Sequence, residues 1–296
     1  MNINKTELYT KLSEAKKKAL KIFWLSAGTI GGISIPLIIY LRQPVFLIFV
    51  VLIIIVISAF TNKNYSKIYK KELVAPALSE IFTDVVYTPE KGIPSSVLAN
   101  TSMIYTGDSY TTEDYVSGKY KDIKFSSADI DIQEQHTDSD GNTTYVTIFK
   151  GQWMIFDFNK PFKSDLLLYE RGIAIARRGH RKNENNFEKV EMEDISFNKK
   201  FTVYARNSLE AFYLLTPNTM EKIKKLKESL SGGLIFCFHN NELHIGLNNY
   251  KDLYEGNMFR KLDIEKEIEL VNEQMKIITN FIDILDLDND LFRREV

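Results

Sequence analysis

The most prominent pattern in the chain is a pair of apolar segments near its N-terminus, at residues 22–41 and 44–60. Neither contains a charged residue, and Arg42 is the only charge between Lys21 and Lys63. As an α-helix, the first segment would be about 30 Å long, which is the thickness of the hydrocarbon core of a bilayer. The second segment is shorter, and local thinning of the bilayer would accommodate it. The pattern therefore predicts two transmembrane helices.

Because only Arg42 and Gln43 separate these segments, the two helices must run antiparallel as a transmembrane hairpin. The lysines that flank the hairpin are Lys5, Lys11, Lys16, Lys17, Lys18, Lys21, Lys63, Lys67, Lys70 and Lys71. By the positive-inside rule, both termini are then cytoplasmic in a multi-pass protein of the cell membrane. This divides the chain into a basic N-terminal segment (1–21), the hairpin (22–60, with spans at 22–41 and 44–60) and a cytoplasmic domain (61–296).

Two other interpretations of the apolar segments compete with this one. A cleaved signal peptide would have a shorter apolar core followed by polar mature sequence, whereas here a second apolar segment follows. A buried hairpin in a soluble core would show a polar face, which residues 45–57 lack. Gly28 and Gly32 form a GxxxG pattern, which favours either packing of the hairpin on itself or contact with a second copy.

Beyond residue 61 the pattern changes from helix to strand. Residues 62–81 have the spacing of an amphipathic helix that Pro76 interrupts. A period of two follows over residues 115–169, where Ile130 and Ile132 alternate with polar positions. Asp140 and Gly141 predict a turn there, and the apolar run after it predicts a central strand bent at Gly151. Further strands are expected at residues 166–169, 190–192 and 201–205, and a helix is expected to begin at Thr216 and Pro217 and to end at Gly232 and Gly233.

Residues 234–247 predict a β-hairpin, because Asn240 and Asn241 suit a two-residue turn. In that register one face of the hairpin is entirely apolar. Residues 263–287 predict a long helix with apolar residues spaced alternately by four and three. A coiled-coil dimer is one interpretation, but a third apolar row favours a helix docked on the sheet. The predicted fold class is α+β: a transmembrane hairpin followed by an antiparallel sheet with flanking helices.

Composition narrows the possible partners. The formal net charge of −1 gives no reason to expect nucleic-acid binding, which requires a clearly basic domain. Cys237 is the only cysteine, so an intramolecular disulfide is impossible. The chain has no phosphate-binding loop, dinucleotide fingerprint, GxSxG or HExxH motif, and no cofactor is expected.

The other face of the predicted hairpin carries the one candidate for metal chemistry. Cys237, His239, Glu242 and His244 would share that face, and these are zinc-ligand types at cross-strand distances. Their spacing matches no established zinc signature, and a half-buried hairpin ordinarily turns polar residues to solvent. The sequence therefore assigns no metal site, and these four residues remain candidates only.

Two other polar groups were considered as sites. Arg177, Arg178, Arg181 and Lys182 form a basic cluster that suits anionic lipid headgroups, with a solvated loop as the alternative. Asp129 with Asp131, or Glu191 with Glu193, would resemble an acid and base pair. Their alternation with apolar residues instead predicts a solvent-facing side of a strand. No catalytic residue is assigned.

Several patches in a fixed order resemble a bacterial membrane-anchored family known as domain of unknown function (DUF) 3137. They are Tyr105 with Asp114 and Tyr115; Phe149, Lys150 and Gly151; Phe197, Phe201 and Tyr204; and Leu215, Thr216, Pro217 and Met220. The resemblance covers residues 62–290. It implies paired spans before the domain and a LemA-like membrane protein as a partner, and no catalytic residue.

The sequence thus predicts a membrane-tethered cytoplasmic binding or scaffold module rather than an enzyme. Its expected partners are the lipid bilayer and another membrane protein. Self-association could use the helix at 263–287 or the Gly28 and Gly32 face. The alternative is a membrane-anchored, metal-dependent enzyme that uses the Cys237, His239 and His244 face of the hairpin.

Overall fold

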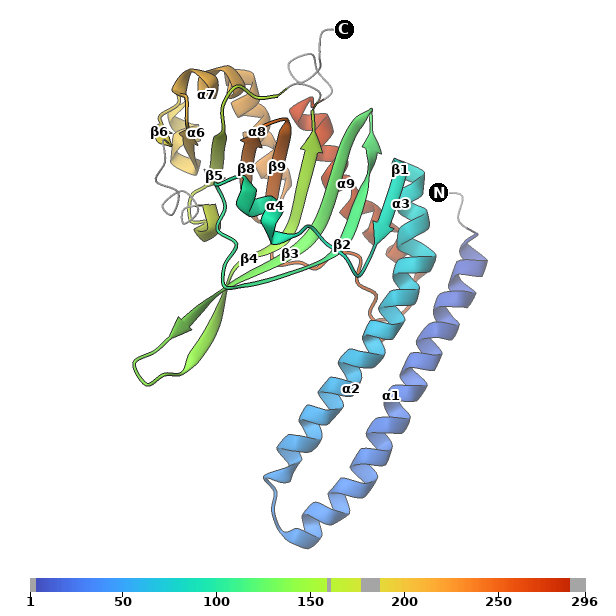
Figure 1. Cartoon of the computed structure of the whole chain (residues 1–296). Helices are drawn as coiled ribbons and strands as arrows, with labels where there is room; N and C mark the ends of the chain where they lie inside the picture. The colour runs from blue at the N-terminus through green and yellow to red at the C-terminus, as the bar shows by residue number, and fades with distance from the viewer. Residues whose placement is uncertain (1–3, 159–160, 177–186, 288–296) are drawn as a thin grey trace. The chain divides into compact units, whose positions relative to one another are not determined.

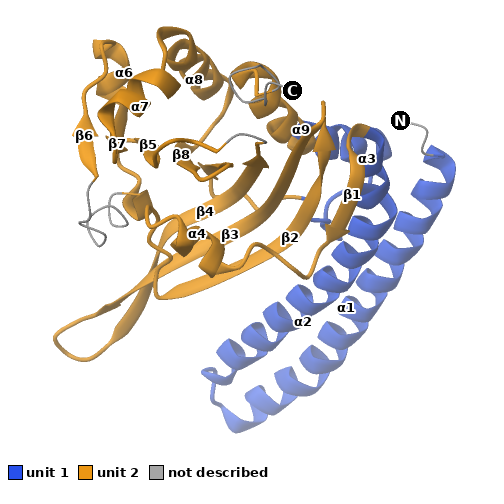
Figure 2. Cartoon of the chain, turned by 45° about the horizontal axis from the view of Figure 1, so that its top comes forward, with its two compact units in different colours: residues 1–80, 254–273 blue, residues 81–253, 274–296 orange. Residues whose placement is uncertain are grey.

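The computed structural model describes residues 4–158, 161–176 and 187–287. It has the α+β architecture that the sequence predicts: two long N-terminal helices, then an antiparallel sheet with flanking helices (Figure 1). The chain divides into two compact units. Unit 1 comprises residues 1–80 and 254–273, and unit 2 comprises residues 81–253 and 274–296 (Figure 2).

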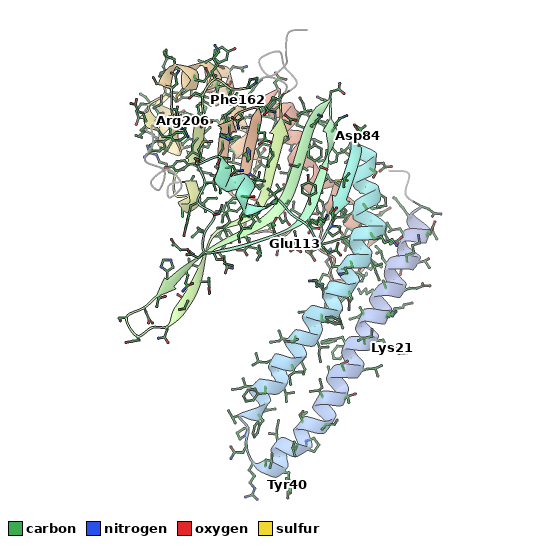
Figure 3. The ribbon with its side chains drawn as sticks, viewed as in Figure 1. Lys21, Tyr40, Asp84, Glu113, Phe162 and Arg206 are labelled. Atoms are coloured by element: carbon green, nitrogen blue, oxygen red, sulfur yellow. The ribbon has the colours of Figure 1, made fainter. Side chains whose placement is uncertain are left out.

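Unit 1 is built on the helices α1 (Lys5–Leu41) and α2 (Phe46–Tyr69). The Asn4 side chain accepts hydrogen bonds from the first turn of α1, and Arg42 ends this helix in a left-handed conformation. Both helices are long and apolar enough to cross a membrane, and only 6% of the most apolar window of each is buried. Lys21 and Tyr40 lie at either end of the charge-free part of α1 (Figure 3).

The GxxxG face of α1 does not pack the helical hairpin on itself, which corrects one of the two sequence-based interpretations. A Cβ atom placed on Gly28 or Gly32 would meet nothing within 4 Å. Both glycines are exposed, whereas α1 contacts α2 through other residues, among them Phe23. The two glycines therefore lie on an outer surface of the helical pair.

The interruption predicted at Pro76 takes the form of a wider helical turn. After α2 the chain continues as a π-helical turn, η1 (Lys70–Val74), and then as α3 (Ala75–Ile81). Proline has no N–H group to donate to the preceding turn, and its ring crowds the carbonyl four residues back. A π-helical turn immediately before Pro76 relieves both effects without ending the helix.

In the part of unit 2 that the structure describes, the sheet has nine strands in the order β1-β2-β3-β4-β9-β8-β5-β7-β6, and every neighbouring pair is antiparallel. The strands are β1 (Thr83–Thr88), β2 (Ser109–Tyr120), β3 (Ile123–Thr137), β4 (Thr143–Asp157), β5 (Leu166–Glu170), β6 (Glu188–Val190), β7 (Phe201–Ala205), β8 (Gly233–His239) and β9 (Glu242–Asn248). The helices of this region are α4 (Ser95–Asn100), α6 (Ile195–Lys200), α7 (Ser208–Leu214), α8 (Pro217–Ser229) and α9 (Ile264–Leu285).

The β8–β9 hairpin has the predicted register, with His239 opposite Glu242 and Cys237 opposite His244. Its two strands lie in the interior of the sheet, between β4 and β5. Ile235 and Cys237 belong to a core cluster with Trp153 and with Leu98 of α4. The expectation of a half-buried hairpin was therefore wrong, because both faces of this hairpin are covered.

Helix α9 is docked within the chain, as its wide apolar stripe predicts. Val271, Met275, Ile278 and Ile282 have no exposed surface. In unit 2, the Phe281 ring packs edge-on against Phe236 of β8, with 6.5 Å between ring centroids. The helix begins in unit 1 and ends in unit 2, because the boundary between the units falls after residue 273.

Candidate functional site

A polar pocket of about 270 Å³ lies on one face of the sheet of unit 2. Strands β2, β3 and β4 form its floor, and the loop after β9 forms one wall. The residues that line it are Thr111, Thr112, Glu113, Asp129, Ile130, Asp131, Lys150 and Asp252. Four of these eight side chains are carboxylates and one is a cation, so the pocket has an excess of negative charge.

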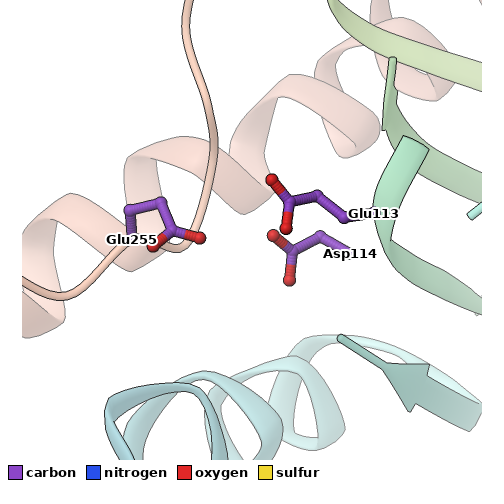
Figure 4. Close-up of side chains that lie close together, drawn as sticks. All are labelled: Glu113, Asp114 and Glu255. Atoms are coloured by element: carbon purple, nitrogen blue, oxygen red, sulfur yellow. The ribbon is translucent and has the colours of Figure 1, made fainter. Parts of the chain in front are cut away.

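Strand register brings these carboxylates together. Glu113 pairs with Asp129 across β2 and β3, and Asp131 pairs with Thr111 on one side and Lys150 on the other. Directly opposed residues in antiparallel strands turn their side chains to the same face. The register of β2 shifts just after Glu113, and the next residue, Asp114, has a positive φ of 57°. Figure 4 shows the two neighbouring carboxylates, Glu113 and Asp114, on this strand.

Asp129 is the most deeply buried carboxylate of the pocket, with 5% of its surface exposed. The loop after β9 covers it, and the backbone N–H of Leu253 donates a hydrogen bond to its Oδ2 over 2.5 Å. The carboxylate of Asp129 lines the pocket, together with those of Glu113, Asp131 and Asp252. Burial raises the pKa of Asp129 well above the usual range, and the nearby Asp114 and Asp252 act in the same direction.

Lys150 supplies the positive charge of the pocket. Its Nζ lies 3.1 Å from Asp252 Oδ1 and 3.6 Å from Asp131 Oδ2. The pKa of Lys150 is raised, because the hydrogen bond to Asp252 and the charges of Asp252 and Asp131 together outweigh desolvation. The remaining oxygen, Asp131 Oδ1, is buried and has no hydrogen-bond partner among the described residues.

This geometry suits a bound cation. An ammonium or guanidinium group has several N–H donors and needs carboxylate or hydroxyl acceptors around it. The pocket offers such acceptors at Asp129, Asp131 and Glu113. A second positive charge would also favour the ionised form of Asp129.

The burial of Asp129 corrects the expectation that it faces solvent. Ile130 and Ile132 do lie in the core on the opposite face of β3, as the alternation predicts. The face of Asp129 is covered as well, by the loop after β9, which follows Asp129 by more than a hundred residues. The predicted solvent exposure of Glu191 and Glu193 is confirmed.

The four candidate metal ligands on the β8–β9 hairpin have partners within the protein. His244 is fully buried; its Nδ1 lies 3.3 Å from Trp153 Nε1 and its Nε2 lies 3.1 Å from Glu242 Oε2. His239 Nδ1 lies 2.8 Å from Asp165 Oδ1. Complete burial raises the pKa of the Cys237 thiol, which therefore stays protonated. No three of these four described side chains bring ligand atoms within 4.8 Å of one another.

The basic cluster Arg177, Arg178, Arg181 and Lys182 lies outside the described residues. Sequence reasoning did not select the pocket itself. In the sequence, Lys150 belongs only to a patch that resembles the family, and no pattern marks Thr111 or Asp252. One feature of the sequence does point to this region, namely the continuous apolar run in β4. Such a run is typical of a strand that is buried on both faces, and it implies that the adjacent strand β3 is covered as well.

Comparisons with known proteins agree with the family resemblance. Residues 147–287 match the model of a family described as "Protein of unknown function (DUF3137)". This confirms the resemblance from β4 to the end of α9, a region that includes Lys150 and Asp252. No curated protein matches the chain.

Among solved structures, a similar chain is that in the crystal structure of the mycobacterial trehalose monomycolate transport factor A, TtfA. The match covers 78% of this chain and 97% of that one, at 13% sequence identity and a TM-score of 0.41. At this identity and TM-score, the similarity gives no basis for assigning a function to this protein.

Proposed function

We propose that this chain is a membrane-tethered binding module. In this proposal α1 and α2 hold it in the cell membrane with both termini in the cytoplasm. The acidic pocket of unit 2 receives a lysine or arginine side chain of a protein partner. A LemA-like membrane protein is the partner that the family resemblance suggests.

The pocket is the observation that carries the binding role. It gathers Glu113, Asp129, Asp131 and Asp252 around one lysine, and it leaves Asp131 Oδ1 buried without a hydrogen-bond partner among the described residues. Buried carboxylate oxygens without a donor are costly, and a cationic donor would satisfy them. The excess of carboxylates also limits the kind of ligand, because an anionic group would be repelled.

The exposed apolar surface of the helices supports the membrane role. Ile33, Ile39 and Val56 are 67%, 71% and 66% exposed. Such a continuous apolar surface would be unstable in water and is stable in a bilayer. The lysines on one side of the hairpin support the cytoplasmic orientation.

A metal-dependent enzyme based on Cys237, His239 and His244 is not proposed. The ring nitrogens of His244 are both hydrogen-bonded inside the protein, and the Cys237 thiol is protonated and inaccessible. A binding module is therefore the function that the described geometry favours.

The binding role is tested by saturation-transfer NMR on the full chain in nanodiscs. The probe is a lysine-containing tripeptide, and its neutral counterpart with norleucine is the reference. We expect transfer to the lysine peptide alone, and its loss when Glu113→Gln and Asp252→Asn are combined. The matched control, Asp140→Asn with Glu191→Gln, removes two exposed carboxylates elsewhere and should leave transfer intact. Equal transfer to both peptides, or no effect of the pocket variant, would refute the binding role.

The orientation is tested by thiol labelling in cells with a membrane-impermeant maleimide. Cys237 is buried and should not react, so the native chain is the unlabelled background. A cysteine in place of Gln43, in the turn between the helices, should be labelled in intact cells. One in place of Leu209, which is 76% exposed in unit 2, should be labelled only after permeabilisation. The opposite pattern would place both termini outside.

A further inference from the structure

The segment 256–261 returns to the helical pair within unit 1, close to where the charge-free part of each helix meets polar sequence. The Asn62 side chain donates to Gly256 O over 3.2 Å and accepts from Met258 N over 2.9 Å. One turn further along α2, Ser66 Oγ accepts from Gly256 N over 3.2 Å. Asn62 lies two residues after Phe60, the last residue of the second predicted span. The segment is therefore fixed at the end of that span.

Close packing reinforces these hydrogen bonds. A Cβ atom on Gly256 would lie 2.8 Å from the Tyr69 ring, so only glycine allows the segment to approach α2 so closely. Met258 is completely buried in a cluster with Ala19, Phe23 and Tyr65. Its neighbour Phe259 is thereby held in a defined position beside α1.

Phe259 belongs to a small aromatic group at the start of the first predicted span. Its ring packs edge-on against Phe23 with 5.2 Å between centroids, and Phe23 packs on Trp24 at 5.1 Å. Phe259 is 51% exposed and Trp24 is 66% exposed. Aromatic rings grouped in this way, with half or more of their surface exposed, are favourable at the boundary between headgroups and hydrocarbon.

Charge around this aromatic group fits a lipid surface. Lys21, Lys63 and Lys261 are all exposed, and each lies within a few residues of Phe23, Asn62 or Phe259 along the chain. Lysines at this level would contact lipid phosphates while the aromatic rings lie below them. Segment 256–261 thus has the same combination of a lysine and an aromatic residue as the start of the first span, although the two are far apart in the sequence.

We infer that segment 256–261 is a third membrane contact, in which Phe259 inserts into the interfacial layer of the bilayer that α1 and α2 cross. This inference rests on the proposed membrane anchoring. Segment 256–261 binds the surface of a phospholipid bilayer. This contact is additional to the two spans, and its residues directly precede α9. The start of α9 is then held at the membrane surface.

Depth-dependent quenching tests the inference in the full chain, with Cys237→Ala as background. Single cysteines carrying an environment-sensitive fluorophore replace Phe259, Ile48 in the second span, or Leu209 in unit 2. The protein is reconstituted in phosphatidylcholine–phosphatidylglycerol vesicles that contain nitroxide lipids labelled near the headgroup or deep in the acyl chain. The label at 259 should be quenched at least twofold more by the shallow nitroxide than by the deep one. The label at 48 should be quenched by the deep nitroxide at least as strongly as by the shallow one, and the label at 209 should be insensitive to both.

The outcomes separate the inference from the proposal on which it rests. Quenching at 48 without quenching at 259 would overturn the third contact and leave the anchoring intact. Absence of quenching at both positions would overturn the anchoring itself. Because a label replaces the Phe259 ring, a second variant, Lys261→Cys, keeps Phe259 and should also be quenched by the shallow nitroxide; an unquenched label there would likewise overturn the third contact.

Discussion

Trp153 Nε1 lies 3.3 Å from His244 Nδ1, and both side chains are completely buried between adjacent strands of the sheet. An indole nitrogen can only donate, so His244 Nδ1 accepts and the imidazole proton lies on Nε2, where it faces Glu242. His244 therefore connects the interior of the sheet to a partly exposed carboxylate. A histidine that the sequence offers as a metal ligand is here part of the core.

Replacing His244 should test this role directly. His244→Ala leaves the Trp153 N–H without an acceptor and opens a cavity, so we expect the free energy of unfolding to fall by about 2–5 kcal/mol. The measurement is denaturant unfolding of the full chain in detergent, followed by tryptophan fluorescence in a Trp24→Phe background, in which Trp153 is the remaining tryptophan. His136→Ala, at an exposed position on β3, is the control and should change stability by less than about 0.5 kcal/mol. A fully stable His244→Ala variant that had lost bound zinc would instead support a metal site.

Asp129→Asn should stabilise the protein at neutral and alkaline pH. The pKa of Asp129 is raised in the folded protein, so the folded state holds its proton more tightly than the unfolded state does. The contribution of Asp129 to stability is most favourable below about pH 3.9, the pKa of this carboxyl in the unfolded chain. That contribution is lost as pH rises through the pKa of Asp129 in the folded protein. The advantage of Asn over Asp should therefore grow with pH, as thermal unfolding at several pH values would show.

The same substitution should alter ligand binding. A bound cation favours ionised Asp129, so affinity for the lysine peptide should rise with pH in the native chain as that proton is released. Asp129→Asn should remove this dependence on pH. Asp140→Asn, in the exposed turn between β3 and β4, should retain it. A native chain whose affinity did not change with pH would exclude Asp129 from the binding site.

Gly151→Ala should be among the most damaging single-methyl changes in unit 2. Gly151 has φ near 150°, and an added Cβ would lie 2.1 Å from the carbonyl oxygen of Leu247 on β9. The backbones of β4 and β9 cannot move apart here without breaking the pairing between these strands. We therefore expect the free energy of unfolding to fall by about 3 kcal/mol or more. Gly141→Ala provides a matched control, because Gly141 also has a positive φ but open space around it. Gly141→Ala should lower the free energy of unfolding by about 1 kcal/mol. Equal losses for the two variants would show that backbone strain, and not the close contact with Leu247, accounts for the effect at Gly151.

Glu267→Ala should weaken unit 1 by about 2–4 kcal/mol. Glu267 is 5% exposed; it accepts a hydrogen bond from the Tyr69 hydroxyl over 3.0 Å and pairs with Arg260. Burial first, and then the Glu267 charge, raise the pKa of Tyr69, so its hydroxyl remains a donor at any ordinary pH. Tyr69→Phe removes that single hydrogen bond and should cost about 1 kcal/mol. In a double-mutant cycle the two changes should be coupled, and strictly additive losses would contradict the contact.

The elements that the sequence predicts correctly are those determined by nearby residues. The register of β8 with β9 follows from Asn240 and Asn241 and from an alternation within a few residues of them. The start of α8 follows from the Thr216 cap and Pro217, whereas the helix ends at Ser229, three residues before the predicted Gly232. In each case the residues that decide the structure are adjacent in the chain.

The features that the sequence did not predict depend on distant segments. Asp129 occupies a polar position of an alternating strand and is buried only because Leu253 and its neighbours cover it. Cys237 is buried because the region around Leu98 covers that face of the hairpin. Alternation identifies which residues share a face, but it does not tell whether another part of the chain will cover that face.

The assignment of residues 254–273 to unit 1 has a consequence for biosynthesis. At typical translation rates, the ribosome completes α1 and α2 about 10–40 s before it reaches Glu255 and Gly256. During that interval Ser66 of α2 and Lys70 of η1 do not yet have Glu255, which both contact in the finished protein. The helices α1 and α2 are thus synthesised first, but unit 1 is complete only after residues 254–273 have been added. A nascent chain truncated before residue 254 would therefore enter the membrane without the contacts that these residues make with α2.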